Sequence, residues 1–509
     1  MDKKKKSIKI FGFGLLSQTI TLILGIVIPK LVIVSYGSET NGFLSSVRQV
    51  FVYIALLEAG IGTASLQALY KPIANGNREQ TSSIMSATDR YYKKTGTLYG
   101  IAVVIFAIVY PLFVKTEIDS LVVVAVILLQ GASGVINYFF QGKYTILLRV
   151  DGKSYITTNA TTVVSTATKL IQIGLMLNGF NIIAVQAAYF AVNFLQMLYI
   201  TLYVKKHYRW LDLSVEPNYS ALSQSKNVII HQVSGLIFNN TDILVLTVFC
   251  GLKIVSVYSL YSLIISCVSN IIDTICSSVE FALGQAFNSD KDHFLVLQEV
   301  YETYYLAISF AFFTITLIMF PSFIRIYAKG ITDVNYVDKY LPILFVALNV
   351  LLYARRTSSQ IINFAGHFKQ TQWRSVIESI INLSVSLILV RRIGIYGVLI
   401  GTIVALIYRT NDIIIYANRI ILGRSPLKTY RRWGHNLTIM TILYLFSQRL
   451  LPSIDNYAHW VGYSIIIAII CFALFFVLGS MTDKNSFKYF QRVLISCVNK
   501  IKNNITSFK

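Results

Sequence analysis

Residues 1–34 read MDKKKKSIKIFGFGLLSQTITLILGIVIPKLVIV, a cluster of lysines followed by a long apolar run. The run from Ile8 to Val34 is too long for the hydrophobic part of a signal peptide and has no small-residue cleavage site. A helix of about 20 apolar residues crosses the hydrocarbon core of a bilayer. The stretch therefore predicts a first transmembrane helix, and its lysines predict a cytoplasmic N-terminus.

The composition of the whole chain indicates the same class of protein. Of its 509 residues, 55% are hydrophobic and only 13% are charged, and the mean hydropathy is +0.61. A soluble chain carries about 25% charged residues. The apolar runs do not alternate with period two, which excludes a β-barrel, and backbone in lipid must then form helices. We predict an all-α integral membrane protein.

The formal net charge of +22 admits a nucleic-acid partner or a membrane protein with basic cytoplasmic loops. No basic stripe with interleaved aromatic residues lies outside the apolar runs, so we expect no nucleic-acid binding. The cysteines form no CxxC or Cys/His pattern, so we expect neither a disulfide framework nor a bound metal.

About fourteen spans are predicted, which places the N- and C-termini on the same, cytoplasmic side. Lys and Arg gather in the even-numbered loops, as expected for cytoplasmic loops, and the acidic loop Asn288–Val300 is an exception. The basic loop residues are Lys71, Arg78, Arg90, Lys93, Lys94, Lys205, Lys206, Arg209, Arg424, Lys428, Arg431 and Arg432. The expected spans are 8–35, 43–70, 95–114, 120–142, 158–178, 181–204, 227–250, 254–284, 302–328, 338–363, 374–392, 395–420, 435–452 and 460–480.

A weak internal repeat divides the spans. A shift of 214 or 215 residues superimposes six spans on six spans, so both halves keep the same orientation, as in a parallel repeat. Three glycine pairs match under this shift: Gly37 and Gly251, Gly152 and Gly366, and Gly179 and Gly394. We predict a six-helix lobe over 1–215, a second over 216–420, and two added helices with a basic tail over 421–509. Such lobes suggest a central cavity and alternating access.

Ionisable residues inside a span are costly and tend to mark a pathway. Acids suggest sites for a coupling proton or sodium ion, and the candidates are Glu58, Asp242, Asp273 and Glu280. Gln18 in the first span is a polar cavity candidate. A helix face in the seventh span presents His231 and Asn239 as further polar candidates for a cavity. The same polar face also fits a helix–helix interface held by hydrogen bonds.

Cations inside the spans suggest an anionic substrate. The candidates are Lys30, Arg48, Lys169, Arg355 and Arg356. Lys30 and Arg48 admit a second reading, in which the side chains reach the membrane interface. Adjacent residues of a helix point about 100° apart, so Arg355 and Arg356 cannot share one direction. Arg409 and Asp412 lie at i, i+3 and can neutralise each other.

Several motifs resemble the bacterial polysaccharide repeat-unit flippases of the multidrug/oligosaccharidyl-lipid/polysaccharide exporter superfamily. They are GIVIP at 25–29, YGSETNG at 36–42, LLEAGIG at 56–62, LYKP at 69–72, NTD at 240–242 and AGHFK at 365–369. In span number and order the resemblance covers essentially the whole chain, and the first 70 residues are its most specific part.

The resemblance implies a V-shaped fold of two six-helix lobes, often with two added helices, in the bacterial plasma membrane. It implies that undecaprenyl-diphosphate-linked oligosaccharides are flipped from the inner to the outer leaflet, driven by a proton or sodium gradient and without another cofactor. The partners are then lipid-linked oligosaccharide, membrane lipid, a polysaccharide polymerase and other assembly proteins. The residues that match the relatives' cavity are Lys30, Arg48, Glu58, Asp242 and Asp273.

Three other classes of protein remain as alternatives. A drug or organic-cation antiporter of the same superfamily would need an acid-dominated pocket, whereas this chain has mixed charges. A polysaccharide polymerase or ligase would need catalytic groups in a sizeable extracytoplasmic loop, and no such set stands in the sequence. A purely structural membrane protein would not need ionisable residues in several spans.

Overall fold

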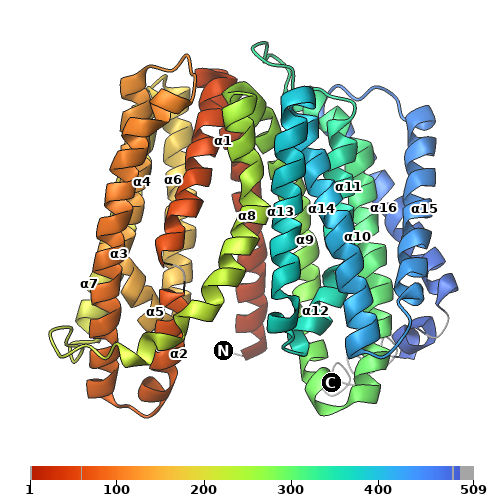
Figure 1. Cartoon of the computed structure of the whole chain (residues 1–509). Coiled ribbons are helices and arrows are strands. Elements are labelled where there is room, and N and C mark those ends of the chain that lie inside the picture. Colours follow the sequence, from red (N-terminus) through yellow and green to blue (C-terminus); the bar gives the residue numbers. More distant parts are fainter. Residues whose placement is uncertain (1–2, 59, 484–485, 493–509) are drawn as a thin grey trace. The chain divides into compact units, whose positions relative to one another are not determined.

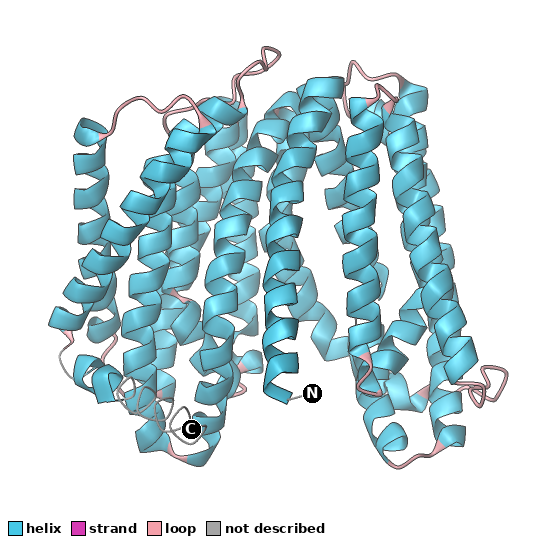
Figure 2. Cartoon of the chain, turned by 180° about the vertical axis from the view of Figure 1, so that it is seen from behind, coloured by secondary structure: helices cyan, strands magenta, loops and turns pink. Residues whose placement is uncertain are grey.

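The computed structural model describes the backbone of residues 3–58, 60–483 and 486–492. Side chains in these ranges are described from residue 23 onward, except at 223–234, 239, 278 and 281. The predicted polar residues Gln18, His231 and Asn239 therefore lie outside the described side chains. Over the ranges described, the regular structure is entirely helical, joined mostly by short loops (Figures 1 and 2). The predicted fold class is confirmed.

The chain forms two compact units, Met1–Leu260 and Tyr261–Lys509. The predicted lobe boundaries after residues 215 and 420 remain predictions. In the first unit the helices are α1 (Lys3–Ile54), η1 (Ala55–Glu58), α2 (Ile61–Ala74), α3 (Arg78–Phe113), α4 (Ser120–Ile136), the π-helical η2 (Asn137–Gln141), α5 (Gly142–Val150), α6 (Ser154–Leu177), α7 (Ile182–His207), η3 (Ser220–Ser225) and α8 (Lys226–Phe249).

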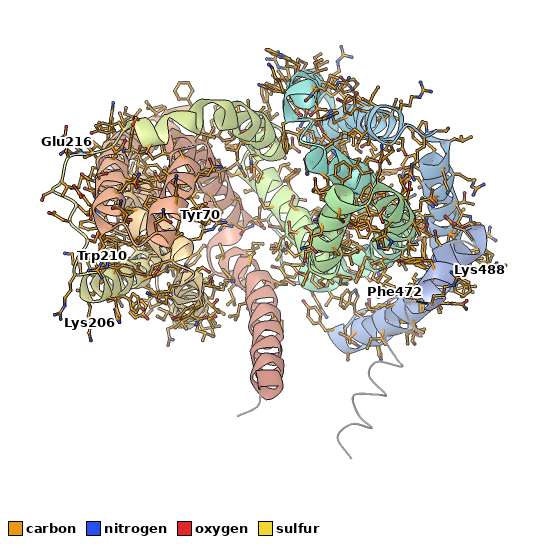
Figure 3. All side chains as sticks on the ribbon, turned by 90° about the horizontal axis from the view of Figure 1, so that it is seen from below. Tyr70, Lys206, Trp210, Glu216, Phe472 and Lys488 are labelled. Carbon is orange, nitrogen blue, oxygen red and sulfur yellow. The ribbon has the colours of Figure 1, made fainter. Side chains whose placement is uncertain are left out.

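Helix α9 (Leu252–Ser289) begins in the first unit and continues into the second. The remaining helices of the second unit are α10 (Lys291–Tyr327), α11 (Leu341–Ala354), α12 (Arg356–Phe364), α13 (Phe368–Ile393), α14 (Ile395–Tyr416), the π-helical η4 (Ala417–Ile421), α15 (Leu427–Leu450) and α16 (Tyr457–Thr482). Helix α16 packs on α10, where the rings of Phe312 and Phe472 meet edge to face at 5.0 Å. Figure 3 labels Phe472 on its helix.

Each of the fourteen predicted spans falls on a helix or on consecutive helices. Nine helices of the described chain are long and apolar enough to cross a membrane, so the chain is a multi-pass membrane protein. Many large apolar side chains along these helices are exposed, as expected for surfaces that face lipid.

The predicted loops are wrong in extent, because several helices continue beyond their apolar part. Arg90, Lys93 and Lys94 were placed in a loop, but α3 already begins at Arg78. The predicted loop Asn288–Val300 is almost entirely helical, with only Asp290 between α9 and α10. The carboxylate of Asp290 accepts hydrogen bonds from the first backbone N–H groups of α10 and so caps this helix.

The glycines matched by the sequence repeat share an unusual backbone conformation. The φ angles are 87° and 80° at Gly37 and Gly251, 70° and 67° at Gly152 and Gly366, and 74° and 57° at Gly179 and Gly394. Positive φ is costly for residues with a Cβ atom, so glycine is the residue that suits these turns. Each pair ends or interrupts helices at equivalent places in the order of elements, which supports the predicted repeat.

Helix α1 is two helical segments joined at Gly37, and its second segment packs against the start of α9. Here Gly42 lies so close to Leu252 that an added Cβ atom would stand 1.8 Å from the backbone oxygen of Leu252. The amide of Asn41 donates a hydrogen bond to Ser256 at 2.7 Å beside this contact. A small residue lets the two backbones approach, as is common between membrane helices.

We predict that Gly42→Ala destabilises the protein by about 1–3 kcal/mol, because the Leu252 backbone must move away. Gly174→Ala is the matched control, since it lies in α6 with open space around it. It should leave stability unchanged or raise it by up to about 1 kcal/mol through helix propensity. Thermal unfolding in detergent measures both variants, and equal Tm values for the two would contradict the close contact.

Candidate functional site

Three predicted site residues of the second unit meet in one cluster. The Arg356 guanidinium, at the start of α12, donates hydrogen bonds to Asp273 and to Glu280, both on α9. The distance from Arg356 Nε to Glu280 Oε1 is 3.2 Å. Asp273 and Glu280 lie seven residues apart, about two helical turns, on one face of α9. Their side chains converge on two nitrogens of the same guanidinium. We call these three residues the acid–arginine cluster.

Tyrosines from two other helices complete the acid–arginine cluster. Tyr353 of α11 donates its hydroxyl hydrogen bond to Asp273 Oδ1 at 3.0 Å and lies under the Arg356 guanidinium. Tyr301 of α10 donates to Glu280 Oε1 at 3.4 Å. The three charged side chains are partly exposed, Glu280 least at 23%. The cluster is therefore partly accessible on one side and held by hydrogen bonds on the other.

The neighbouring Arg355 points into a second network, which confirms that the two arginines diverge. Its guanidinium donates to Glu378 of α13 at 2.6 Å. Glu378 also pairs with Arg409 of α14, whose guanidinium donates to Asp412 at 2.5 Å. Arg374 donates to the other oxygen of Asp412. The i, i+3 pairing of Arg409 with Asp412 is confirmed, as one link of a larger buried network.

The helix break between α11 and α12 explains how adjacent arginines serve two networks. Helix α11 ends at Ala354 and α12 begins at Arg356, so Arg355 stands between them. Arg355 was predicted as a substrate contact, yet its charge is compensated by Glu378, and its side chain is only 14% exposed. The role of Arg356 is also conditional, because two carboxylates already hold it.

In the first unit two predicted cations lie close together. Arg48 is exposed on the second segment of α1, and Lys169 is half-buried on α6, which packs against α1. The Lys169 ammonium lies within electrostatic reach of Arg48. Two cations held at short range in a membrane-spanning region repel each other, and an anion bound between them would relieve this repulsion. Lys30 is half-buried further back along α1.

Asp242 of α8 is buried in the first unit. The hydroxyl of Tyr258, at the start of α9, donates a hydrogen bond to Asp242 Oδ2 at 2.8 Å. The preceding residue, Thr241, shares a 2.8 Å hydrogen bond with Tyr53 of α1. These bonds join α1, α8 and α9 around Asp242, the arrangement expected of a polar helix interface. An ion-coupling role for Asp242 remains a prediction.

Glu58 lies at the end of η1, where the path from α1 to α2 breaks. Tyr92 of α3 donates a hydrogen bond to the Glu58 carboxylate. Gly60 has a φ of 87° and precedes α2, and a Cβ atom on Gly62 would stand 3.1 Å from Glu58 Oε1. The glycines of the LLEAGIG motif therefore form the turn and leave room for the carboxylate.

The sequence did not indicate the tyrosines that contact these acids. Tyr353 precedes Arg356 by three residues, and this spacing is a signal that could have been used. Tyr92, Tyr258 and Tyr301 each contact an acid on a different helix, so no local spacing marks them. In the described residues no group of three or more His, Cys, Asp or Glu side chains fits a metal ion.

No protein-family model and no curated protein matches the sequence. Solved structures match the fold. A lipid II flippase, MurJ, in an inward closed conformation aligns with a TM-score of 0.68 at 13% identity, over 92% of this chain and 98% of that one. An inward-facing multidrug resistance MATE family transporter of the MOP superfamily aligns at 0.62 and 15% identity, over 83% and 95%.

The MATE multidrug transporter DinF-BH also aligns, with a TM-score of 0.57 at 12% identity, over 80% of this chain and 94% of that one. Identities this low establish the fold alone. The chain therefore has the all-helical fold seen in the MurJ flippase and in MATE transporters of the MOP superfamily.

We predict that Arg409→Leu destabilises the protein by roughly 1.5–3 kcal/mol, because the buried Glu378 and the half-buried Asp412 each lose one of two arginine partners. Arg392→Leu is the control, since Arg392 is exposed at the end of α13 and should change stability by no more than about 0.5 kcal/mol. Thermal unfolding in detergent compares the two. A similar Tm for both variants would show that the buried network contributes little.

Proposed function

We propose that this protein is a lipid-linked oligosaccharide flippase. It moves undecaprenyl-diphosphate-linked polysaccharide repeat units from the inner to the outer leaflet of the bacterial plasma membrane by alternating access, coupled to a cation gradient. In this proposal the N- and C-termini are cytoplasmic, and no cofactor other than the coupling ion, Na⁺ or H⁺, is needed. A polysaccharide polymerase and other assembly proteins would use the product.

The proximity of Arg48 and Lys169 is the observation that carries the proposal. The lipid tail of the substrate can remain in the bilayer, but its diphosphate cannot cross hydrocarbon without help. A diphosphate carries several negative oxygens, which suit a guanidinium fork and an ammonium group from two neighbouring helices. Both residues stand in helices that are long and apolar enough to span a membrane, where a charge without function would be costly.

A cation-coupled antiporter of drugs or organic cations is the second candidate. The fold is shared with MATE transporters, and acids occur in both units at Glu58, Asp242, Asp273 and Glu280. Tyrosines or arginines already bind these acids, which leaves less free negative charge for an organic cation. We therefore place the antiporter second, and a polymerase or ligase below it.

We expect that Arg48→Gln with Lys169→Gln slows flipping at least tenfold, about 1.4 kcal/mol, because the diphosphate loses both cations. Liposomes would hold a lipid-diphosphate-linked oligosaccharide labelled on its sugar. An external sugar-modifying enzyme then reports exposure of the label, with and without a proton or sodium gradient. Lys94→Gln, on the exposed surface of α3, is the matched control and should flip normally.

Unchanged flipping by the folded double variant would reject the pair as the diphosphate site. Exposure no greater than in empty liposomes for the unaltered protein would reject the flippase. In that case, the antiporter is tested by whether expression of the protein lets cells grow in the presence of toxic organic cations.

A further inference from the structure

A buried polar face runs along α10 in the second unit. Gln298, Glu302, Tyr305 and Ser309 follow the spacing i, i+4, i+7, i+11, which places them on one side of the helix. All four are almost completely inaccessible, with Gln298 at 0% and the others at 1%. These four buried polar residues share one face of a helix whose buried residues are mostly apolar. We call them the α10 polar face.

Two members of the α10 polar face have polar atoms without a side-chain or backbone partner, namely both amide atoms of Gln298 and one carboxylate oxygen of Glu302. On α12, Thr357 and Gln360 are also buried with such atoms. The hydroxyls of Tyr305 and Ser309 lie next to each other and interact. Buried polar atoms nearly always have partners, and ordered water is the usual one where side chains do not meet. The polar face therefore has the chemistry of a hydrated path.

At Glu302 the α10 polar face joins an ion-pair network that is open to solvent. Glu302 accepts hydrogen bonds from Arg424 at 3.1 Å and from Arg432 of α15 at 2.8 Å. Glu299, which lies three residues before Glu302 on α10, is 28% exposed and pairs with Lys428 at 2.6 Å. Both acids lie near the start of α10, which the predicted topology of the spans places on the cytoplasmic side.

The same network fixes the position of the path. Arg432 also donates to Asp483, which follows the end of α16. Burial alone would raise the pKa of Asp483, but the hydrogen bonds and charge of Arg432 hold it below its usual range. Asp483 thus stays ionised at neutral pH, and its contact with Arg432 keeps α10, α15 and α16 together around Glu302.

Beside Gln298, the same part of α10 also meets the acid–arginine cluster through Tyr301. Tyr301 lies three residues after Gln298, about one helical turn, and donates to Glu280. Gln360 of α12 lies beside Tyr301, and Tyr305 lies within electrostatic reach of Arg356. Polar side chains of α10 and α12 therefore lead from the solvent-exposed ion pairs to the Glu280 carboxylate.

The chemistry of the acid–arginine cluster favours a proton over a metal ion. The Arg356 guanidinium binds one oxygen of each carboxylate, lies where Na⁺ would have to bridge them and repels a second cation. Asp273 and Glu280 together carry one more negative charge than Arg356 compensates. The other groups that face the cluster are the neutral Cys276, Tyr301, Tyr305 and Tyr353, whereas Arg355 points away to Glu378. One proton on Glu280 would leave Arg356 and Asp273 as a balanced pair.

We propose that the coupling ion is a proton, that it binds to Glu280, and that it reaches Glu280 along the α10 polar face. The proton leaves hydronium at the end near Glu299 and forms an O–H bond on the Glu280 carboxylate, and Arg356 keeps its charge. Arg356 is then held by Asp273 alone and is free to turn one N–H group to another anion. This inference rests on the proposed cation-coupled transport, but the proton site can be measured without transport.

Infrared spectroscopy after a pH jump tests the proposal on the protein in liposomes without added substrate. Acidification should produce the C=O stretching band of a protonated carboxyl group, and Glu280→Gln should remove this band. Gln298→Leu should keep the band but slow its appearance at least about tenfold, because a polar step of the path is lost. Thr357→Val, on the α12 side of the path, should also slow the appearance of the band.

Thr314→Val is the matched control, since Thr314 is equally buried on α10 but lies on the opposite side of the helix and donates to its own helix backbone. It should leave the rate unchanged. Three results would overturn the proposal: a band that survives in Glu280→Gln, an unchanged rate in both Gln298→Leu and Thr357→Val, or a carboxylate band that responds to Na⁺ at constant pH. A protein that binds the proton but flips no lipid would reject the proposed function and keep the proton site.

Discussion

The structure depends on the need to compensate charge where water is scarce. A charge in a membrane-spanning region is stable only with a partner, a hydrogen-bond donor or access to water. The second unit satisfies this constraint through Arg355 and Arg356, which stand at a break between two helices. One binds a buried carboxylate on α13 and the other binds two carboxylates on α9. Two adjacent residues thus connect the break between α11 and α12 to both of these helices.

The same constraint acts differently in the first unit. There, tyrosine hydroxyls rather than arginines bind the acids Glu58 and Asp242. Two cations, Arg48 and Lys169, lie near enough to repel each other. The first unit is thus better suited to hold an anion and the second to bind a proton. In the proposed transporter, substrate and coupling ion would use different units.

Helix interruptions position the candidate site residues in both units. Glu58 lies in a 3₁₀ turn before a glycine with positive φ, and Arg356 begins a short helix after a break. An uninterrupted helix would direct these side chains along its own regular faces. A break lets neighbouring residues point to different partners, as Arg355 and Arg356 do. Such interruptions are tolerated within a membrane only where other groups satisfy the backbone.

The sequence by itself determined the helical membrane fold, because apolar runs of sufficient length have no other stable form in lipid. It also determined the candidate residues, since an ionisable residue stands out in an apolar run, and it showed the repeat through glycines such as Gly37 and Gly251. Only the tertiary structure decided which of these residues meet. Arg356 was predicted to bind substrate and Asp273 to bind an ion, yet they contact each other across helices α12 and α9. Pairing across helices depends on their rotation and spacing, which local sequence patterns do not encode. The burial of the α10 polar face around Gln298 likewise depends on how the helices pack, so only the structure showed it.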